Sequence, residues 1–434
     1  MKLWSAILFL FLLLPAITYA EPNFERKLFT LDINDTHASL LWAHENTGQV
    51  VASTTGTVDA DMDVPEAWQL IAASTTSEVV VGIIDTGVLY THPDLDASMW
   101  NPASCLDETG TTTTCIHGYD FENNDSDPLP DHFHGTHLAG IIAAEVNNSL
   151  GVAGVASTTK IVALRFALDV ASEVRAIDFA IQNGIKIINA SYGGPQFSQA
   201  EYDAIERFKN AGGLFIAAAG NESADNDSGT HTYPADLDLD NIISVAATDQ
   251  DDKLASFSNW GATSVDVAAP GKNILSTYLL DQYAIESGTS MSTAYVSGLA
   301  ALIWSVEPDL TAREVKERIL SRGDALPALS GKVLSGKRVN AYNSLTTSTE
   351  VIEEATTTPV EIPPPPPPEQ PQSRGGGGGG GGGGRSEAPR DLKPGDLNND
   401  NRFDLLDFNS LMIQWSTLPN AFADFNNLMV NWSK

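Results

Sequence analysis

The chain has 434 residues and a formal net charge of −32, with 56 acidic against 24 basic side chains. Such an excess of negative charge repels phosphate backbones and anionic lipid surfaces, so it argues against nucleic acid and membrane surfaces as partners. A solvated surface accounts for most of the carboxylates, and the remainder suits a soluble extracellular protein that binds cations.

Residues 1–20 are typical of a secretory signal peptide. Lys2 precedes an apolar stretch that is too short to cross a bilayer, and small residues suited to cleavage close the segment. A later apolar run that begins at Val296 is interrupted by Gly298 and Ser305, so no membrane span is expected. The sequence therefore predicts export, with a secreted or extracellular protein as the product.

Two cysteines, Cys105 and Cys115, flank a threonine-rich loop. In an oxidising compartment a pair this close most simply forms a local disulfide, which stabilises the fold by roughly 2–3 kcal/mol in the chain-entropy model. A metal site built from two lone cysteines is a much weaker alternative.

Continuous apolar runs alternate with helix-like stretches through most of the chain before residue 350. The strand-like runs are 79–85, 161–166, 185–190, 214–219, 242–247 and 265–268. The helix-like stretches are 135–146, 171–183, 200–211, 290–306 and 311–321, the last with a capping box at Thr311 and Glu314. This alternation predicts an α/β fold with a doubly wound, mostly parallel sheet and helices on both faces. Ligands of such sheets bind at the carboxyl ends of the strands.

Asp85 ends the first strand-like run and is followed by Thr86 and Gly87. Aspartic proteases use the same tripeptide, but they need two copies of it. A near-copy begins at Asp227, yet no predicted strand delivers it, so this alternative is weak.

His134 and His137 stand at the mouth of a predicted helix. Histidines three apart can chelate zinc from one helix face, although no third ligand accompanies them here. Ser290 opens the later apolar helix directly after a glycine turn. It is either an ordinary helix cap or a nucleophile whose backbone N–H can hold an oxyanion.

The order aspartate, histidine, serine is one of the arrangements that serine hydrolases use. Five blocks in this order, "VGIIDTGV", "HGTHLAG", "INASYGG", "FIAAAGNES" and "SGTSMS", resemble those of the subtilisin-like serine proteases, the subtilase family. The resemblance extends over roughly residues 60–345 and implies a subtilisin-like fold and hydrolysis of polypeptide substrates.

The resemblance implies a role for each matching residue. Ser290 is expected to be the nucleophile, His134 the base that later becomes the acid, and Asp85 the group that orients the imidazole. Asn221 is expected to donate its side-chain amide to the oxyanion beside the Ser290 backbone N–H. The residues expected to contact the substrate are Ser191, Tyr192, Gly193, Ala218 and Gly220. Glu222 lies either near the floor of the specificity pocket or in a solvated loop, and the sequence favours neither.

Two features depart from the family pattern. After the nucleophile the usual proline and histidine are replaced by Ala294 and Tyr295, which is expected to change cleft shape or rate rather than abolish activity. Many secreted relatives carry an inhibitory prodomain, whereas 21–62 resembles part of the catalytic domain. We therefore expect the mature chain to start near Glu21.

Calcium is the expected structural cofactor. The resemblance implies a site formed by Asp94, Asn148 and the backbone oxygens of Leu150 and Val152. No other cofactor is implied.

The C-terminal tail contains an EF-hand-type loop with oxygen ligands at Asp396, Asn398, Asp400, Asp404 and Asp407, and with the Arg402 carbonyl as a further ligand. With an aspartate at its last position, this loop resembles a dockerin repeat, the module that docks onto cohesin domains. The stretch "DFNSLMIQW" recurs as "DFNNLMVNW", but the second copy lacks its own loop. A small EF-hand-like helical tail with one calcium site is predicted, cohesin binding is doubtful, and an acidic solvated tail is the alternative.

The expected layout is a signal peptide (1–20), an N-terminal extension (21–62), a catalytic domain (63–348), a Pro/Gly-rich linker (349–394) and the calcium-binding tail (395–434). The leading hypothesis is a secreted serine endopeptidase with an attached docking module. The alternatives are a catalytically weak binding protein on the same scaffold, anchored through the tail, and a protein whose chief function lies in the tail.

Overall fold

The structure is a computed structural model that describes residues 33–72, 74–156 and 158–346. The strands of its main sheet are β3 (Val80–Asp85), β6 (Gly118–Asp120), β7 (Lys160–Arg165), β8 (Ile187–Ala190), β9 (Leu214–Ala218), β10 (Ile242–Thr248), β11 (Val267–Pro270), β14 (Asp324–Ala325) and β15 (Lys337–Arg338). The helices of the same region are α1 (Val64–Ile71), α2 (His134–Ala143), α3 (Val170–Gln182), α4 (Gln199–Asn210), α5 (Thr289–Val306), α6 (Ala312–Arg322) and α7 (Ala341–Leu345).

The main sheet has nine strands in the order β14-β15-β11-β10-β9-β8-β3-β7-β6. Every neighbouring pair in it is parallel except β14 with β15. The prediction of a mostly parallel α/β fold is therefore confirmed, and the six predicted strands are all present with ends shifted by a few residues.

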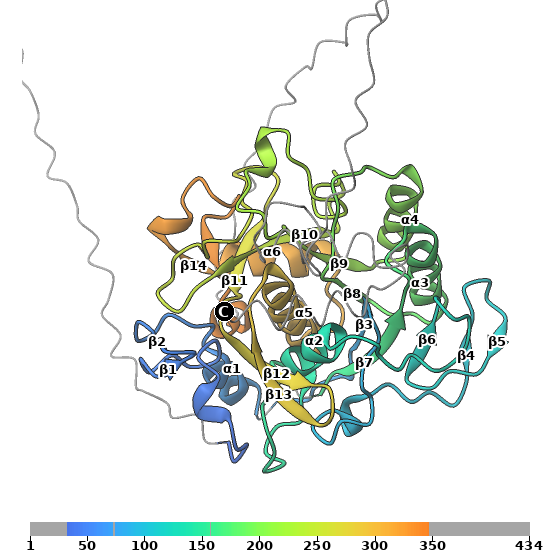
Figure 1. Cartoon of the computed structure of the whole chain (residues 1–434), viewed down its shortest axis with the longest axis horizontal. Coiled ribbons are helices and arrows are strands. Elements are labelled where there is room, and N and C mark those ends of the chain that lie inside the picture. The colour runs from blue at the N-terminus through green and yellow to red at the C-terminus, as the bar shows by residue number, and fades with distance from the viewer. Residues whose placement is uncertain (1–32, 73, 157, 347–434) are drawn as a thin grey trace, which may run out of the picture. The chain divides into compact units, whose positions relative to one another are not determined.

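Helices cover both faces of the sheet (Figure 1). Along β3, Val81 and Ile83 belong to one core cluster and Ile84 to a second, because successive strand side chains point to opposite faces. The first cluster includes the buried sides of α2, α5 and α6, and the second those of α3 and α4. The doubly wound arrangement follows from this alternation.

Helix α5 is buried along almost its whole length, which explains why its sequence shows no polar face. Gly298 lets α5 pack closely against Val155, since a Cβ at position 298 would lie 2.8 Å from the Cβ of Val155. The next helix, α6, begins with the predicted capping box, in which the side chains of Thr311 and Glu314 each bind the other's backbone N–H.

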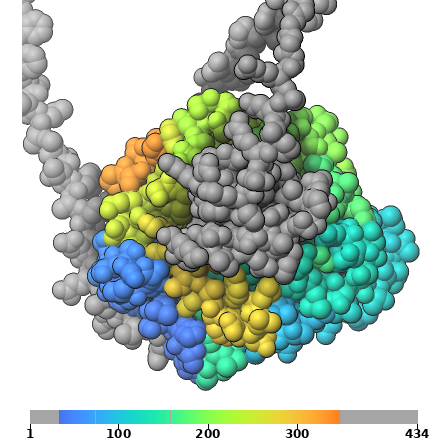
Figure 2. Space-filling view, viewed as in Figure 1, coloured from blue at the N-terminus to red at the C-terminus, as the bar shows by residue number. Residues whose placement is uncertain are grey.

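Residues 33–62 pack against the body of the domain. The Trp42 indole N–H donates to the carbonyls of Lys272 and Asn273, and both Trp42 and Met62 are buried. Asn273 leads into the hairpin β12 (Ile274–Tyr278) and β13 (Gln282–Glu286), which the sequence analysis did not predict. Figure 2 shows the N-terminal segment (blue) beside this hairpin (yellow).

The predicted disulfide between Cys105 and Cys115 is present. It closes the small hairpin of β4 (Cys105–Leu106) and β5 (Thr112–Thr113). In the part of the chain that the structure describes, no helix combines the length and hydropathy that a bilayer crossing requires.

Candidate active site

Asp85 and His134 meet at the carboxyl end of the sheet. Asp85 ends β3 and His134 opens α2, and the His134 Nδ1 lies 2.8 Å from Asp85 Oδ2 and 3.0 Å from Oδ1. Gly135 permits this approach, because a Cβ there would lie 2.3 Å from the carbonyl oxygen of Gly87. The Thr86 N–H and hydroxyl donate to Asp85 Oδ1 at 2.8 and 3.0 Å and hold the carboxylate in place.

The two groups shift each other's pKa. Burial disfavours the charged imidazole of His134, but the adjacent Asp85 carboxylate outweighs burial and raises the pKa of His134 above its usual 6.5. Burial likewise favours the neutral form of Asp85, yet the charge and hydrogen bond of His134 prevail and lower the pKa of Asp85. The pair therefore favours an imidazolium bound to a carboxylate, which is the charge state that forms during acyl transfer.

Ser290 is the second residue of α5, and only 8% of its surface is exposed. Its hydroxyl donates to the carbonyl oxygen of Ser191 at 3.2 Å, and the Ser191 hydroxyl donates to the Ser290 carbonyl at 3.0 Å. Among the contacts of the described residues, none joins the Ser290 hydroxyl to His134. Catalytic hydrogen bonds are often loose in a free enzyme and tighten when substrate binds.

Asn221 follows β9 (Leu214–Ala218) and is held by the start of α5. Its Oδ1 accepts from the N–H and the hydroxyl of Thr289 at 2.9 and 3.1 Å. These bonds occupy the amide oxygen and turn the amide nitrogen toward Gly288, where an added Cβ would lie 3.6 Å from Nδ2. Asn221 thus presents a donor beside the residues that lead into Ser290.

The predicted substrate-contacting residues lie at the ends of β8 and β9. Gly193 has no room for a side chain, since a Cβ would lie 2.6 Å from Thr232 Cγ2. Gly220 has a φ of +110°, and a Cβ there would lie 2.3 Å from Asn259 Nδ2. Asn259 also donates to Glu222 Oε2 at 2.8 Å, which fixes that carboxylate beside Gly220. Ala218 is buried at the end of β9.

The sequence analysis missed Glu286, which ends β13 four residues before Ser290. Its carboxylate acts on His134 and contributes to the raised pKa of that imidazole. Burial raises the pKa of Glu286 itself, against the opposing charge of His134. No local motif distinguishes this glutamate, because it reaches the site through the β12–β13 pairing.

The two weaker alternatives receive no support from the geometry. The Asp227 carboxylate accepts from Thr263 and Ser264, and no contact among the described residues joins it to Asp85. His137 is fully buried with Nε2 3.1 Å from the Ala284 carbonyl, and burial lowers its pKa to about 3. His137 is therefore a neutral core residue rather than half of a chelating pair.

The residues of the predicted calcium site lie together. Asp94 is completely buried, and its oxygens accept from Asn148 Nδ2 at 2.7 Å and from the Val152 N–H at 2.9 Å. Burial raises the pKa of Asp94. Asp35, which the sequence analysis did not single out, accepts from the backbone N–H of Asn148. The buried carboxylate and the neighbouring amide are ligand types that suit calcium, but Asn148 Oδ1 accepts from the Leu150 N–H, so the amide would have to turn its oxygen toward Asp94 to bind an ion.

A second acidic cluster consists of Asp59, Asp61 and Asp63, whose carboxylate oxygens lie within 4.8 Å of one another. Burial is the main reason why the pKa of Asp61 is raised, to about 7. The six predicted ligands of the tail, Asp396 to Asp407, lie outside the described residues.

A family model described as the subtilase family matches residues 76–336, more than half of the chain. The Thermophilic serine proteinase of Bacillus sp. (strain AK1) is 38% identical over 341 residues, which cover 76% of this chain and 73% of the relative. Thermitase of Thermoactinomyces vulgaris is 37% identical over 286 residues, which cover 65% of this chain and 92% of thermitase. Subtilisin DY of Bacillus licheniformis is 36% identical over 250 residues, 56% of this chain and 83% of the relative.

Among solved structures, a protease from Pseudoalteromonas arctica PAMC 21717 superposes with a TM-score of 0.58 at 26% identity, covering 72% of this chain and 98% of that protein. The residues that the family model matches include Asp85, His134, Asn221 and Ser290. The chain belongs to the subtilase family and is a subtilisin-like serine endopeptidase.

Proposed function

We propose that the enzyme cleaves polypeptides through a triad of Asp85, His134 and Ser290, with an acyl-enzyme intermediate. The contact of 2.8 Å between His134 Nδ1 and Asp85 is the observation that carries the proposal. It leaves Nε2 as the ring nitrogen available to take a proton, because Nδ1 donates its own to the carboxylate.

In the first half-reaction Ser290 Oγ turns from the Ser191 carbonyl toward His134, which removes its proton as Oγ attacks the scissile carbonyl carbon. The Ser290 N–H and Asn221 Nδ2 stabilise the negative oxygen of the tetrahedral intermediate. When the peptide C–N bond breaks, His134 returns the proton to the leaving amine. In the second half-reaction a water molecule, deprotonated by His134, attacks the ester and releases Ser290.

Residues Ser191, Tyr192 and Gly193 are proposed to pair with the substrate backbone as an added strand. The backbone of this segment is already held at Gly194, whose N–H and carbonyl pair with Tyr233 at 2.9 and 2.8 Å. Ala218 and Gly220 are proposed to form the wall of the adjoining side-chain pocket.

Calcium is proposed as a structural ion held by Asp94, Asn148, Leu150 and Val152. Its charge would compensate the buried Asp94 carboxylate and hold the loop to the segment that contains Asp35. No catalytic step passes through this ion.

We also propose that the enzyme acts outside the cell and that the tail attaches it to a cohesin-like or cell-surface partner. Residues 1–20 and the EF-hand-type loop support these proposals at the level of sequence alone. Deletion of 351–434 is expected to leave peptide hydrolysis intact and to remove only attachment, and lost hydrolysis in the shortened enzyme would contradict a separate role for the tail.

The triad is tested by labelling with a fluorophosphonate, which reacts with an activated serine. The wild-type enzyme is expected to be labelled and the Ser290→Ala variant to be neither labelled nor active. Ser287→Ala, which changes an exposed serine three residues away, is the matched control and should be labelled at the wild-type rate. Full hydrolysis by Ser290→Ala would refute the proposed nucleophile.

A further inference from the structure

Tyr192 lies between two anchored ends of the segment proposed to bind substrate. At one end Ser191 exchanges hydrogen bonds with Ser290, and at the other Gly194 pairs with Tyr233. Between these points the backbone is held from behind by the side chain of Tyr192. Whatever fixes that side chain therefore also fixes the strand that the substrate would pair with.

The Tyr192 side chain reaches away from Ser290 into the layer of α3 and α4. Its ring packs on Phe166 with centroids 4.6 Å apart, and its hydroxyl donates to Glu173 Oε1 at 2.8 Å. Glu173 lies in the first part of α3 and is 2% exposed. The substrate segment is thus tied to a buried carboxyl group.

A second buried carboxyl group lies against the first. Glu201, near the start of α4 and 5% exposed, is hydrogen-bonded through its side chain to that of Glu173. Its Oε2 is buried and has no partner among the described residues. Two carboxyl groups can be hydrogen-bonded to each other only when one of them carries a proton. The pair therefore holds at least one proton in this arrangement.

If both glutamates were ionised, no positively charged side chain among the described residues would be in contact to stabilise the second negative charge. Tyr192 lies next to the Glu173 carboxyl group and is also acted on by Asp85 at the end of β3. Among the contacts of the described residues, no lysine or arginine reaches Glu173 or Glu201. Burial and the neighbouring Glu201 both raise the pKa of Glu173 well above its usual value, in keeping with a proton held between the two carboxyl groups.

We infer that Tyr192 is a positioning residue of the substrate-binding segment, and that its hold depends on the proton shared by Glu173 and Glu201. The inference rests on the proposed function, since it assumes that 191–194 pairs with the substrate. Loss of the proton leaves two adjacent buried carboxylates that must move apart, and Glu173 then displaces the tyrosine bound to it. Substrate binding weakens at alkaline pH, while the chemistry at His134 and Ser290 continues.

The test measures KM and kcat separately for a peptide substrate across neutral and alkaline pH. In the wild type, KM is expected to rise at alkaline pH with little change in kcat. Tyr192→Phe keeps the ring but loses the hydroxyl, so its KM is expected to be raised roughly 3- to 10-fold and to show no further alkaline rise. Glu201→Gln removes the second charge but keeps an acceptor for Glu173. Its KM should therefore stay near the wild-type value at neutral pH and should not rise at alkaline pH.

Two matched variants on α4 serve as controls. Glu206→Gln changes an exposed glutamate, and Tyr202→Phe removes a hydroxyl next to Glu201 in sequence. Both should follow the wild-type KM profile. The same series made in Ser290→Ala, with peptide Kd measured directly, separates binding from catalysis and from alkaline loss of activity.

Each outcome decides one question. A KM profile of Glu201→Gln that superimposes on the wild type, or a Tyr192→Phe variant that changes kcat alone, overturns the inference. Undiminished hydrolysis by Ser290→Ala overturns the proposed function instead, since that result concerns the nucleophile and not the segment.

Discussion

His134 faces two carboxylates, and the difference between them matters for catalysis. Asp85 forms a hydrogen bond with Nδ1, whereas Glu286 acts on the ring through its charge. Both favour the imidazolium, so both raise the pKa of His134, but only the bonded one fixes the tautomer. A base must be neutral to accept the serine proton, so a raised pKa moves the loss of activity in acid toward neutral pH.

We expect kcat/KM to rise with pH through a pKa above 6.5, the usual value for histidine, as His134 loses its proton. Asp85→Asn should lower this pKa and reduce kcat by about 10⁴-fold, because the wrong tautomer of His134 then faces Ser290. Glu286→Gln should lower the pKa less and leave kcat largely intact. If kcat/KM of Asp85→Asn depends on the same pKa in acid as kcat/KM of the wild type, this assignment is contradicted.

Asn221 is expected to act only when charge develops on the substrate oxygen. Asn221→Ala should therefore reduce kcat by about 10²–10³-fold while KM changes little. Asn210→Ala, an exposed residue at the end of α4, is the control and should behave as the wild type. Steady-state kinetics on one peptide give kcat and KM for both variants. A change confined to KM in Asn221→Ala would argue against an oxyanion role.

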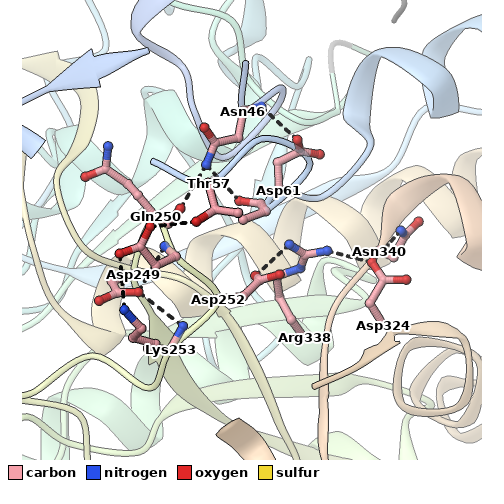
Figure 3. A network of polar contacts seen from close by, with 12 residues as sticks. Asn46, Thr57, Asp61, Asp249, Gln250, Asp252, Lys253, Asp324, Arg338 and Asn340 are labelled. Atoms are coloured by element: carbon pink, nitrogen blue, oxygen red, sulfur yellow. Dashed lines mark hydrogen bonds and ion pairs between the residues drawn. The ribbon is translucent and has the colours of Figure 1, made fainter. Parts of the chain in front are cut away.

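The N-terminal segment and the last strands of the sheet are joined by a polar network (Figure 3). Arg338 on β15 is 3% exposed and binds Asp252 at 2.7 Å and Asp324 at 2.6 Å. Asn340 donates to Asp324 and to Asp63, 277 residues away in the sequence. Arg338, a buried cation, makes two of these four bonds, and the network joins Asp63 and Asp252 to the residues around β14 and β15.

Arg338→Ala is expected to lower the free energy of unfolding by about 3 kcal/mol, because it leaves two partly buried carboxylates without a counterion. That figure lies at the lower end for a buried pair, since the aspartates are about a quarter exposed. Arg313→Ala breaks an exposed pair with Glu317 and should cost only about 0.3–0.5 kcal/mol. Chemical denaturation measures the free energy of unfolding of both variants. Equal losses in Arg338→Ala and Arg313→Ala would show that the buried ion pairs of Arg338 stabilise the fold no more than an exposed pair does.

The whole molecule carries a net charge of −32, so like charges repel one another in the folded chain. Bound cations relieve that repulsion where carboxylates are buried, and Asp94 is the most deeply buried of the predicted ligands that the structure describes. Calcium is therefore expected to act on stability rather than on the chemistry of the triad.

A chelator is expected to lower the Tm of the full-length enzyme, since an ion present at 100 times its Kd stabilises the fold by about 2.7 kcal/mol. Asp94→Asn should start with a lower Tm and respond less to the chelator. Asp400→Asn, in the tail, should leave the response of the catalytic domain unchanged. An unchanged wild-type Tm in chelator would contradict the proposed calcium site at Asp94.

The sequence alone predicted most of what depends on local order. Continuous apolar runs placed the strands, because a parallel sheet covered on both faces buries every strand residue, and the helix-like stretches between them placed the helices. The motifs around Asp85, His134, Asn221 and Ser290 supplied the residue types, and the strand-end rule predicted that they lie at the carboxyl edge of the sheet. The disulfide followed from two cysteines in a short loop.

Tertiary structure decided what depends on packing between distant segments. The hairpin β12–β13 carries Glu286 to the site without a distinctive pattern, and the short strands β14 and β15 exist only through their partners. Glu173 and Glu201 are both buried between α3 and α4, and this burial raises the pKa of each carboxyl group. A sequence specifies which groups can ionise, but burial and neighbours specify which of them do, because both depend on the folded contacts.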